Sequence, residues 1–185
     1  SEDSFVILEI FFAAGCFWGV EKNFESFDGV IDVVSGYSGG NYENPTYQDV
    51  LNNRRNGQGE TFLSILKNIG MSEEEKENSN TLINHTETVK VVYDSSKVST
   101  ETLIKNFWEI HDPTQVNRQG NDVGNNYRSA IYWTTDKQKE IAIRTGQEFQ
   151  KLLSKKGYGQ IVTEMAALEK FWPAEDYPVS YTHLR

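Results

Sequence analysis

The single cysteine of the chain lies where its side chain could act as a nucleophile. Cys16 follows an apolar run and opens a segment with amphipathic helical spacing, and Gly15 allows a tight turn between the two. A cysteine at a helix N-terminus faces the positive end of the helix dipole, which lowers the pKa of the thiol and raises its thiolate fraction. Phe17 and Trp18 place two aromatic surfaces beside the sulfur. A lone cysteine among aromatic residues can equally be a buried, unreactive core residue.

A glutamate further along the chain has the setting of a proton donor. Residues 86–93 alternate as a β-strand does, so Glu87 shares one face with Val89, Val91 and Tyr93. Loss of water on an apolar face raises the pKa of a carboxyl group toward neutrality, which suits a general acid. The alternative is a solvent-facing glutamate at the start of an edge strand. The strand pattern leaves both interpretations open.

The elements that would position these residues follow from hydrophobic periodicity. Strands are expected at residues 5–12, 30–34, 86–93, 129–133 and 160–168, and helices at residues 17–27, 100–110 and 135–155, the last ended by Gly157. A further helix begins near Asn44, with Asn44 as its cap and Pro45 at its first position. Residues 36–40 indicate a turn, and residues 111–127 a long polar loop of the kind that is often functional. Element order alone favours a parallel, doubly wound sheet.

Residues 52–84 differ in character from the rest of the chain. They are rich in Asn, Glu, Lys and Ser, and Ser72 with Glu75 forms the pattern of a capping box, which predicts a short solvent-facing helix. The segment is too short to bury a core of its own. We therefore predict one domain spanning residues 1–185, with residues 52–84 as an inserted surface segment.

Composition excludes several classes of function. The net charge of −9 argues against nucleic acid as a partner, and the chain has no apolar run long enough to span a membrane. The acidic opening is unlike a secretory signal, and a single cysteine allows no intrachain disulfide, so we expect a cytoplasmic protein in a reducing compartment. His85, His111 and His183 lack metal-ligand spacing, so we expect no metal site.

The cysteine motif at residues 15–19 is followed by a series of further motifs. They occupy residues 36–40, 44–47, 85–87, 107–113, 118–122, 127–129 and 174–177. Together this ordered set resembles the type A peptide methionine sulfoxide reductases over most of residues 10–177. The resemblance implies a single α+β domain in which helices flank a mixed central sheet as a two-layer, ferredoxin-like sandwich. It also implies reduction of the S epimer of methionine sulfoxide, free or in proteins, and hence repair of oxidised proteins.

The resemblance assigns catalytic roles to five residues. Cys16, as a thiolate, would attack the sulfoxide sulfur, and Glu87 would protonate the sulfoxide oxygen so that it can leave. Tyr47 and Tyr127 match the tyrosines whose hydroxyl groups hold that oxygen, and Asp122 matches an acidic residue that supports the same network.

The substrate would lie against aromatic side chains. Phe17 and Trp18 would form the pocket for its S-methyl group, beside Tyr47 and Tyr127. Attack leaves a sulfenic acid on Cys16, which an external thiol would reduce: thioredoxin, glutaredoxin with glutathione, or dithiothreitol. No metal or organic cofactor is implied. Oxidised proteins, free methionine sulfoxide and these thiols are the expected partners of a monomer.

The chain departs from the family pattern in three places. The insertion separates the helix of Tyr47 from the strand of Glu87 and can alter access to the site. Asn84 and Asn126 replace a glycine and a glutamine, which we expect to have little effect, and residues 178–185 do not follow the family pattern. A binding module for oxidised methionine and a redox sensor are the competing functions. The acid and the two tyrosines favour an enzyme, because a sensor needs no group to protonate a sulfoxide.

Overall fold

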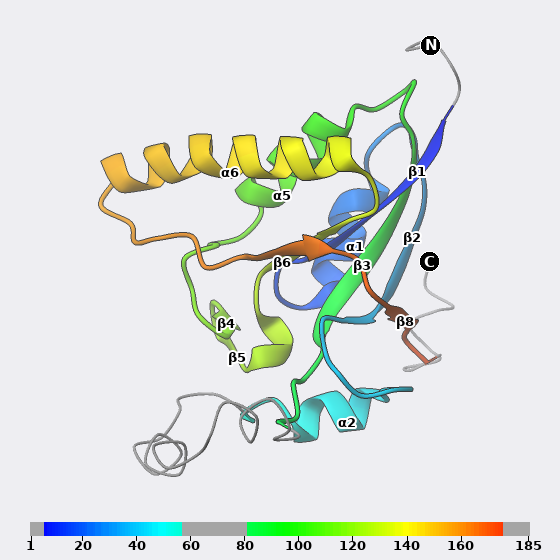
Figure 1. The fold of residues 1–185 in the computed structure, drawn as a ribbon, viewed down its shortest axis with the longest axis vertical. Coiled ribbons are helices and arrows are strands. Elements are labelled where there is room, and N and C mark those ends of the chain that lie inside the picture. The colour runs from blue at the N-terminus through cyan, green and yellow to red at the C-terminus, as the bar shows by residue number, and fades with distance from the viewer. Residues whose placement is uncertain (1–5, 57–80, 176–185) are drawn as a thin grey trace, which may run out of the picture.

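The computed structural model describes residues 6–56 and 81–175, which form a curled mixed sheet flanked by helices (Figure 1). Six strands pair in the order β7-β6-β1-β3-β2-β8. Their bounds are β1 Ile7–Ala13, β2 Val30–Ser38, β3 Thr86–Asp94, β6 Ala130–Trp133, β7 Glu164–Ala167 and β8 Phe171–Pro173. The helices are α1 Phe17–Glu25, α2 Tyr47–Asn52, α5 Thr100–Glu109 and α6 Asp136–Lys155. A two-stranded hairpin, β4 Arg118–Gln119 with β5 Asp122–Val123, leads into the 3₁₀ turn η1, Asn125–Tyr127.

The strand order corrects the parallel arrangement that element order favoured. Strand β3 pairs antiparallel with both β1 and β2, so β1 and β2 run parallel on either side of it and α1 connects them. Strand β1 likewise lies between β3 and β6, which α5 connects. Each strand–helix–strand unit is thus split by a strand of the other unit, which is the ferredoxin-like arrangement. Among the described strands, β6 and β7 are the neighbours that pair in parallel.

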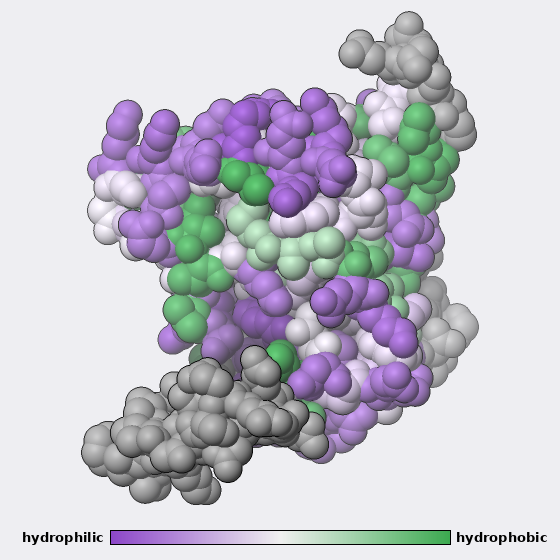
Figure 2. Space-filling model, in the orientation of Figure 1, coloured by the Kyte–Doolittle hydropathy of each residue, from purple (hydrophilic) through white to green (hydrophobic). Residues whose placement is uncertain are grey.

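Helices α1, α5 and α6 pack over one face of the sheet and form the main core with it. The ring of Phe12 on β1 stacks on Phe24 of α1 at 4.7 Å and on Phe107 of α5 at 5.1 Å between centroids. Trp108 of α5 lies buried against α6, where its indole N–H donates to the Thr145 hydroxyl at 2.9 Å. In Figure 1, α6 lies along the top of the molecule and α2 lies at the bottom, with the β4–β5 hairpin at the left between them. Figure 2 shows that the outward side of α6 is mostly hydrophilic.

The opposite face of the sheet is covered by its own curled edge. Phe171 of β8 packs on Phe11 of β1 with ring centroids 5.1 Å apart. Gly36 makes this closure possible, because a methyl group there would overlap the Trp172 carbonyl and the Phe171 ring. Hydrophobic periodicity missed β8, since it is three residues long and ends in proline, and it placed β7 in a longer strand, residues 160–168.

Two further expectations about local structure need correction. Thr46, not Asn44, caps α2: its hydroxyl accepts from the Asp49 N–H at 3.1 Å, and the Asp49 carboxylate accepts from the Thr46 N–H at 3.0 Å. Pro45 therefore precedes the cap, and Tyr47 is the first helical residue. The turn expected at residues 36–40 is in part strand, because β2 runs on to Ser38. The helix expected at Ser72 lies outside the described residues.

Candidate active site

Cys16 lies at the junction of β1 and α1. It is half-buried and is the N-cap residue of α1. Gly15 before it has a φ of +96°, a backbone conformation that residues other than glycine rarely adopt. Burial raises the pKa of the Cys16 thiol. The backbone N–H groups of Trp18 and Gly19 lower that pKa, the charge on Glu87 raises it, and so, more weakly, does that on Asp122. The net direction is upward, so the prediction of a lowered thiol pKa was wrong: the helix end acts as expected but is outweighed.

Glu87 is buried, which decides between the two interpretations that the strand pattern left open. It is 2% exposed, and the alternative of a solvent-facing strand end is wrong. Its Oε1 accepts from the backbone N–H of Phe17 at 3.3 Å, and its Oε2 accepts from Nδ2 of Asn126 at 3.0 Å. Burial raises the pKa of the Glu87 carboxyl to about 7, although both hydrogen bonds lower it. A group with this pKa exchanges a proton near neutral pH.

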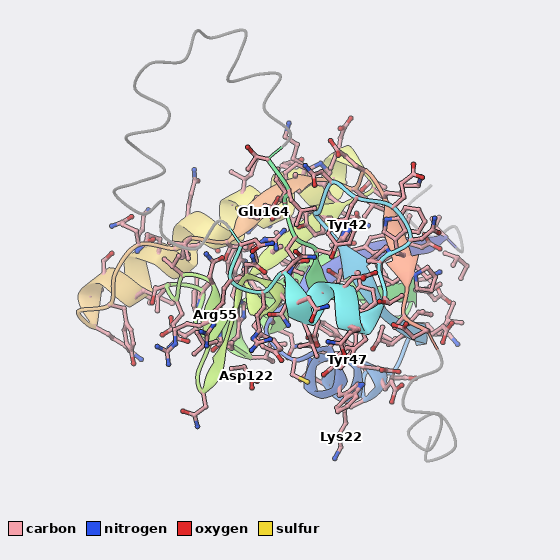
Figure 3. The ribbon with its side chains drawn as sticks, turned by 90° about the horizontal axis from the view of Figure 1, so that it is seen from below. Lys22, Tyr42, Tyr47, Arg55, Asp122 and Glu164 are labelled. Carbon is pink, nitrogen blue, oxygen red and sulfur yellow. The ribbon has the colours of Figure 1, made fainter. Side chains whose placement is uncertain are left out.

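Tyr47 and Tyr127 reach the site from different elements. Burial raises the pKa of Tyr127 to about 12, as does the charge on Glu87, while a hydrogen bond from the Asn126 side chain lowers it. Tyr47 and Asp122 also raise the pKa of Tyr127, so Glu87, Tyr47 and Asp122 are each within electrostatic range of Tyr127. Figure 3 shows Tyr47 on α2 and Asp122 on β5 at the same side of the molecule. Asp122 is exposed, whereas Glu87 lies within.

Aromatic side chains line the site beside the sulfur. Phe17 is buried, and its ring lies 6.1 Å from that of the half-buried Trp18 and 5.7 Å from that of Tyr37. Such rings provide an apolar surface with which a methyl group or a sulfur atom packs well. The structure thus brings together the seven residues named from the sequence.

Several residues of the site were not among the sequence candidates. Tyr37 lies opposite Glu87 across β2 and β3, and its hydroxyl donates to Glu175 at 3.5 Å. The same Glu175 oxygen accepts from the backbone N–H of Tyr47 at 2.6 Å, which ties the segment after β8 to α2. Asn126 holds Glu87, although its substitution for glutamine suggested little consequence. A tyrosine directly after Gly36 in a recognisable motif was the available signal for Tyr37; the partners of Glu175 and Asn126 are too distant in sequence to infer.

Asn84, the other departure from the family pattern, joins three parts of the structure. It is 2% exposed, and its Nδ2 donates to the Val50 carbonyl of α2 at 2.9 Å and to Oδ1 of Asn125 in η1 at 2.7 Å. Its Oδ1 accepts from the Tyr42 hydroxyl at 2.7 Å. Through these bonds the elements that carry Tyr47 and Tyr127 are fixed to each other.

Neither a metal centre nor a membrane span is found in the part of the chain that the structure describes. No group of three or more His, Cys, Asp and Glu side chains there is arranged to hold a metal ion. Over the same residues, the helices are too short or too polar to cross a lipid bilayer.

Fold and site together define a class: a ferredoxin-like α+β protein with a cysteine at a helix N-terminus, a buried acid and tyrosines at one site. The family model of peptide methionine sulfoxide reductase matches residues 8–62 and 73–185. The chain belongs to this family. The two matched ranges leave residues 63–72 unmatched and include the rest of residues 52–84.

Individual relatives agree with the family model. The peptide methionine sulfoxide reductase MsrA of Pseudomonas entomophila is 42% identical over 170 residues, which are 92% of this chain and 64% of the relative. The chain thus spans slightly less than two thirds of this relative's length. Methionine sulfoxide reductase A of Corynebacterium diphtheriae has a TM-score of 0.76 at 33% identity, covering 97% of this chain and 75% of that one. Mxr1 of Saccharomyces cerevisiae, solved in complex with Trx2, shares the fold at a TM-score of 0.56 and 19% identity, covering 94% of this chain and 84% of that one.

Proposed function

We propose that the protein reduces the S epimer of methionine sulfoxide, free or in proteins, to methionine and thereby repairs oxidised proteins. One observation carries the proposal: the Glu87 carboxyl accepts a hydrogen bond from the N–H of Phe17, the residue directly after Cys16. A buried acid that holds a proton near neutrality is thus fixed beside the sulfur. A sulfoxide needs both groups, because its oxygen leaves only when it is protonated.

The acid and the thiol have to act together. The charge on Glu87 raises the pKa of the Cys16 thiol, so protonation of Glu87 favours the thiolate. The form with the proton on the carboxyl is therefore the one in which Cys16 can attack and Glu87 can donate. In this reaction the Cys16 sulfur bonds to the sulfoxide sulfur, and Glu87 gives its proton to the sulfoxide oxygen. The S–O bond of the substrate breaks, the protonated oxygen bonds to the Cys16 sulfur as the temporary S–S bond breaks, and methionine leaves while Cys16 remains as a sulfenic acid. The substrate sulfur gains the two electrons that the cysteine sulfur loses.

The remaining site residues would orient the substrate. The Tyr47 and Tyr127 hydroxyl groups would donate to the sulfoxide oxygen, and the raised pKa of Tyr127 keeps that group protonated as a donor. Asp122 would support this network from β5. Phe17 and Trp18 would hold the S-methyl group, for which their paired rings provide the apolar surface.

An external thiol would complete the cycle. The sulfenic acid on Cys16 would react with one thiol to form a mixed disulfide and water, and a second thiol would release the reduced cysteine. Thioredoxin is the first reductant to test, since a yeast protein of this fold has been solved with Trx2. Glutaredoxin with glutathione, or dithiothreitol, would serve in the same way. We place the protein in the cytoplasm as a monomer, where a reducing environment keeps the thiol available.

We further propose one domain over residues 1–185 with residues 52–84 as an insertion on its surface. Both ends of the undescribed stretch are attached to the body: the Asn56 carbonyl accepts from Asn125 at 2.7 Å, and the Thr81 carbonyl accepts from Asn41 at 2.8 Å. Replacement of residues 57–80 by a short Gly-Ser linker should leave one cooperative unfolding transition. A second transition, or loss of folding, would contradict this organisation.

A single-turnover assay tests the activity. Each purified epimer of methionine sulfoxide in turn is mixed in excess with reduced protein, without added reductant, and methionine is quantified. We expect about one methionine per protein from the S epimer and none from the R epimer. Folded Cys16→Ser protein should form no methionine, because a serine hydroxyl stays protonated and is a weaker nucleophile. Methionine formation by that variant, or equal use of both epimers, would contradict the proposal.

A further inference from the structure

The side chain of Asn126 holds the Oε2 atom of Glu87. It lies in η1, is fully buried, and its Nδ2 donates to Oε2 of Glu87 at 3.0 Å. Its backbone carbonyl accepts from the Thr86 hydroxyl at 3.2 Å, so the turn is held to the start of β3 directly beside Glu87. The position of the amide is therefore set by the fold and does not depend on solvent.

The other end of the same amide is free. Among the described residues, Oδ1 of Asn126 is buried and accepts no hydrogen bond, a state that costs stability for a carbonyl group. Gly124 lies against this oxygen: a methyl group at Gly124 would overlap Oδ1, and its φ of +153° suits glycine. The absence of a side chain at Gly124 thus leaves space for the Asn126 amide, and a side chain on any other residue would fill that space.

We propose that Asn126 is a positioning residue that holds Glu87 both as a carboxylate and as a carboxylic acid. Nδ2 donates to the carboxylate. A half-turn of the amide exchanges nitrogen and oxygen, and Oδ1 then accepts from the protonated carboxyl, so one side chain satisfies both states of a proton donor. The role in catalysis rests on the proposed function of Glu87; the exchange of hydrogen bonds does not.

The ionisable groups around Glu87 affect its carboxyl group in other ways. The charge on Asp122 raises the pKa of Glu87 and so disfavours its carboxylate. Tyr37 and Tyr127 are protonated, with pKa values raised above the ordinary range by burial and by the charge on Glu87 among others. The Asn126 bond is neutral and lowers the pKa of Glu87. Its removal should therefore raise that pKa further.

The test follows Glu87 directly by NMR of ¹³C-labelled glutamate carboxyl groups. A Cys16→Ser background removes the titration of the thiol, and loss of a signal in Glu87→Gln assigns the resonance. We expect Asn126→Ala to raise the midpoint of Glu87 by about one pH unit, as for a lost hydrogen bond to a charged group that water partly replaces. Asn126→Asp keeps the shape of the side chain and should raise the midpoint more, since a second carboxyl disfavours ionisation.

A matched control comes from the neighbouring residue in η1. Asn125 is also buried, but its side chain bonds the carbonyls of Asn53 and Asn56 and the Asn84 amide, not Glu87. Asn125→Ala should loosen the turn without moving the Glu87 midpoint. Equal midpoints in Asn125→Ala and Asn126→Ala, or no change in Asn126→Asp, would overturn the inference.

The half-turn of the amide has its own signature. Below the Glu87 midpoint the Asn126 NH₂ protons should approach the Gly124 Hα protons and give a nuclear Overhauser effect, which should vanish above it. The same contact at every pH would mean that the amide does not turn. In single-turnover assays of protein that retains Cys16, Asn126→Ala should slow methionine formation roughly tenfold. Asn126→Gln should be slowed less, because its amide can restore part of the contact. If the Glu87 midpoint shifts as expected but no protein forms methionine, the unmodified chain included, the proposed activity is refuted and the inference stands.

Discussion

Glu87→Gln should make the protein more stable and less active, and the gain in stability should depend on pH. Folding raises the pKa of the Glu87 carboxyl from 4.5 to about 7, mainly through burial. The folded state therefore binds this proton more tightly than the unfolded chain does. Its contribution to stability is present below pH 4.5, falls as pH rises toward 7, and is lost above that. Glutamine is neutral throughout and avoids the loss.

The difference in pKa sets the magnitude. About 2.5 in pKa corresponds to about 3 kcal/mol in the free energy of unfolding, as an upper value. The glutamine Oε1 can still accept from Phe17, and the Asn126 amide can turn to accept from its Nε2. At pH 8 we expect the variant to be more stable by up to about 3 kcal/mol, or roughly 6–12 °C in Tm for a protein of this size. At pH 4 the two proteins should unfold alike.

Urea unfolding at pH 4 and at pH 8, followed by tryptophan fluorescence, measures both differences. Glu140→Gln on the exposed side of α6 is the control and should change stability equally at the two pH values. The chemical step of Glu87→Gln should be slower by roughly 10²–10⁴-fold. An equal gain for Glu87→Gln at both pH values, or a loss at pH 8, would refute the reasoning from burial.

Three further outcomes are expected. After one turnover without reductant, intact mass should show one added oxygen on Cys16, or its dimedone adduct, because the 185 residues hold no second thiol; a covalent dimer as the main product would contradict the external-thiol route. Tyr47→Phe and Tyr127→Phe should each slow single turnover about tenfold, the effect of one lost hydrogen bond, and an unchanged rate would remove that hydroxyl from the site. Gly36→Ala should lower stability by at least about 2 kcal/mol in urea unfolding, since β8 has to move away from the added methyl group; full stability would show that the contact with Trp172 yields.

Sequence patterns predicted the elements better than their arrangement. Period-2 alternation placed Glu87 on one face with Val89, Val91 and Tyr93 but left open whether Glu87 itself is buried. Thr135 and Gly157 correctly marked the two ends of α6. The parallel sheet was wrong because connections by helices say which strands run parallel but not that another strand lies between them. The family resemblance supplied the correct fold. β8 was missed because three residues that end in proline carry no period, and their contacts lie far away in the sequence.

The site residues likewise divide into those that the sequence could identify and those that depend on contacts between distant parts of the chain. Cys16 and Glu87 could be found from local pattern, and Tyr47, Tyr127 and Asp122 from the resemblance; their chemical roles stay predictions. The sequence shows Asn126 only as a replacement of glutamine with little expected effect, because an amide that bonds a residue 39 positions away leaves no local signal. Long-range side-chain pairs of this kind are decided by the packing of η1 against β3.

The pKa of Cys16 shows why position on a helix is an incomplete guide to reactivity. The helix end lowers it, but burial and the charges on Glu87 and Asp122 raise it by more. The reactive form carries a single proton, held by Glu87 while Cys16 is a thiolate, and pairs of this kind titrate together. The single-turnover rate should therefore rise with pH through about 7, where the doubly protonated site loses its first proton, and fall only where the thiol loses the last. Asp122→Asn removes a charge that raises the pKa of both the thiol and the Glu87 carboxyl, so it should move both the alkaline fall and the acid limb to lower pH. A rate that keeps rising through the thiol pKa would show that the thiolate alone limits the reaction and that Glu87 gives no proton in it.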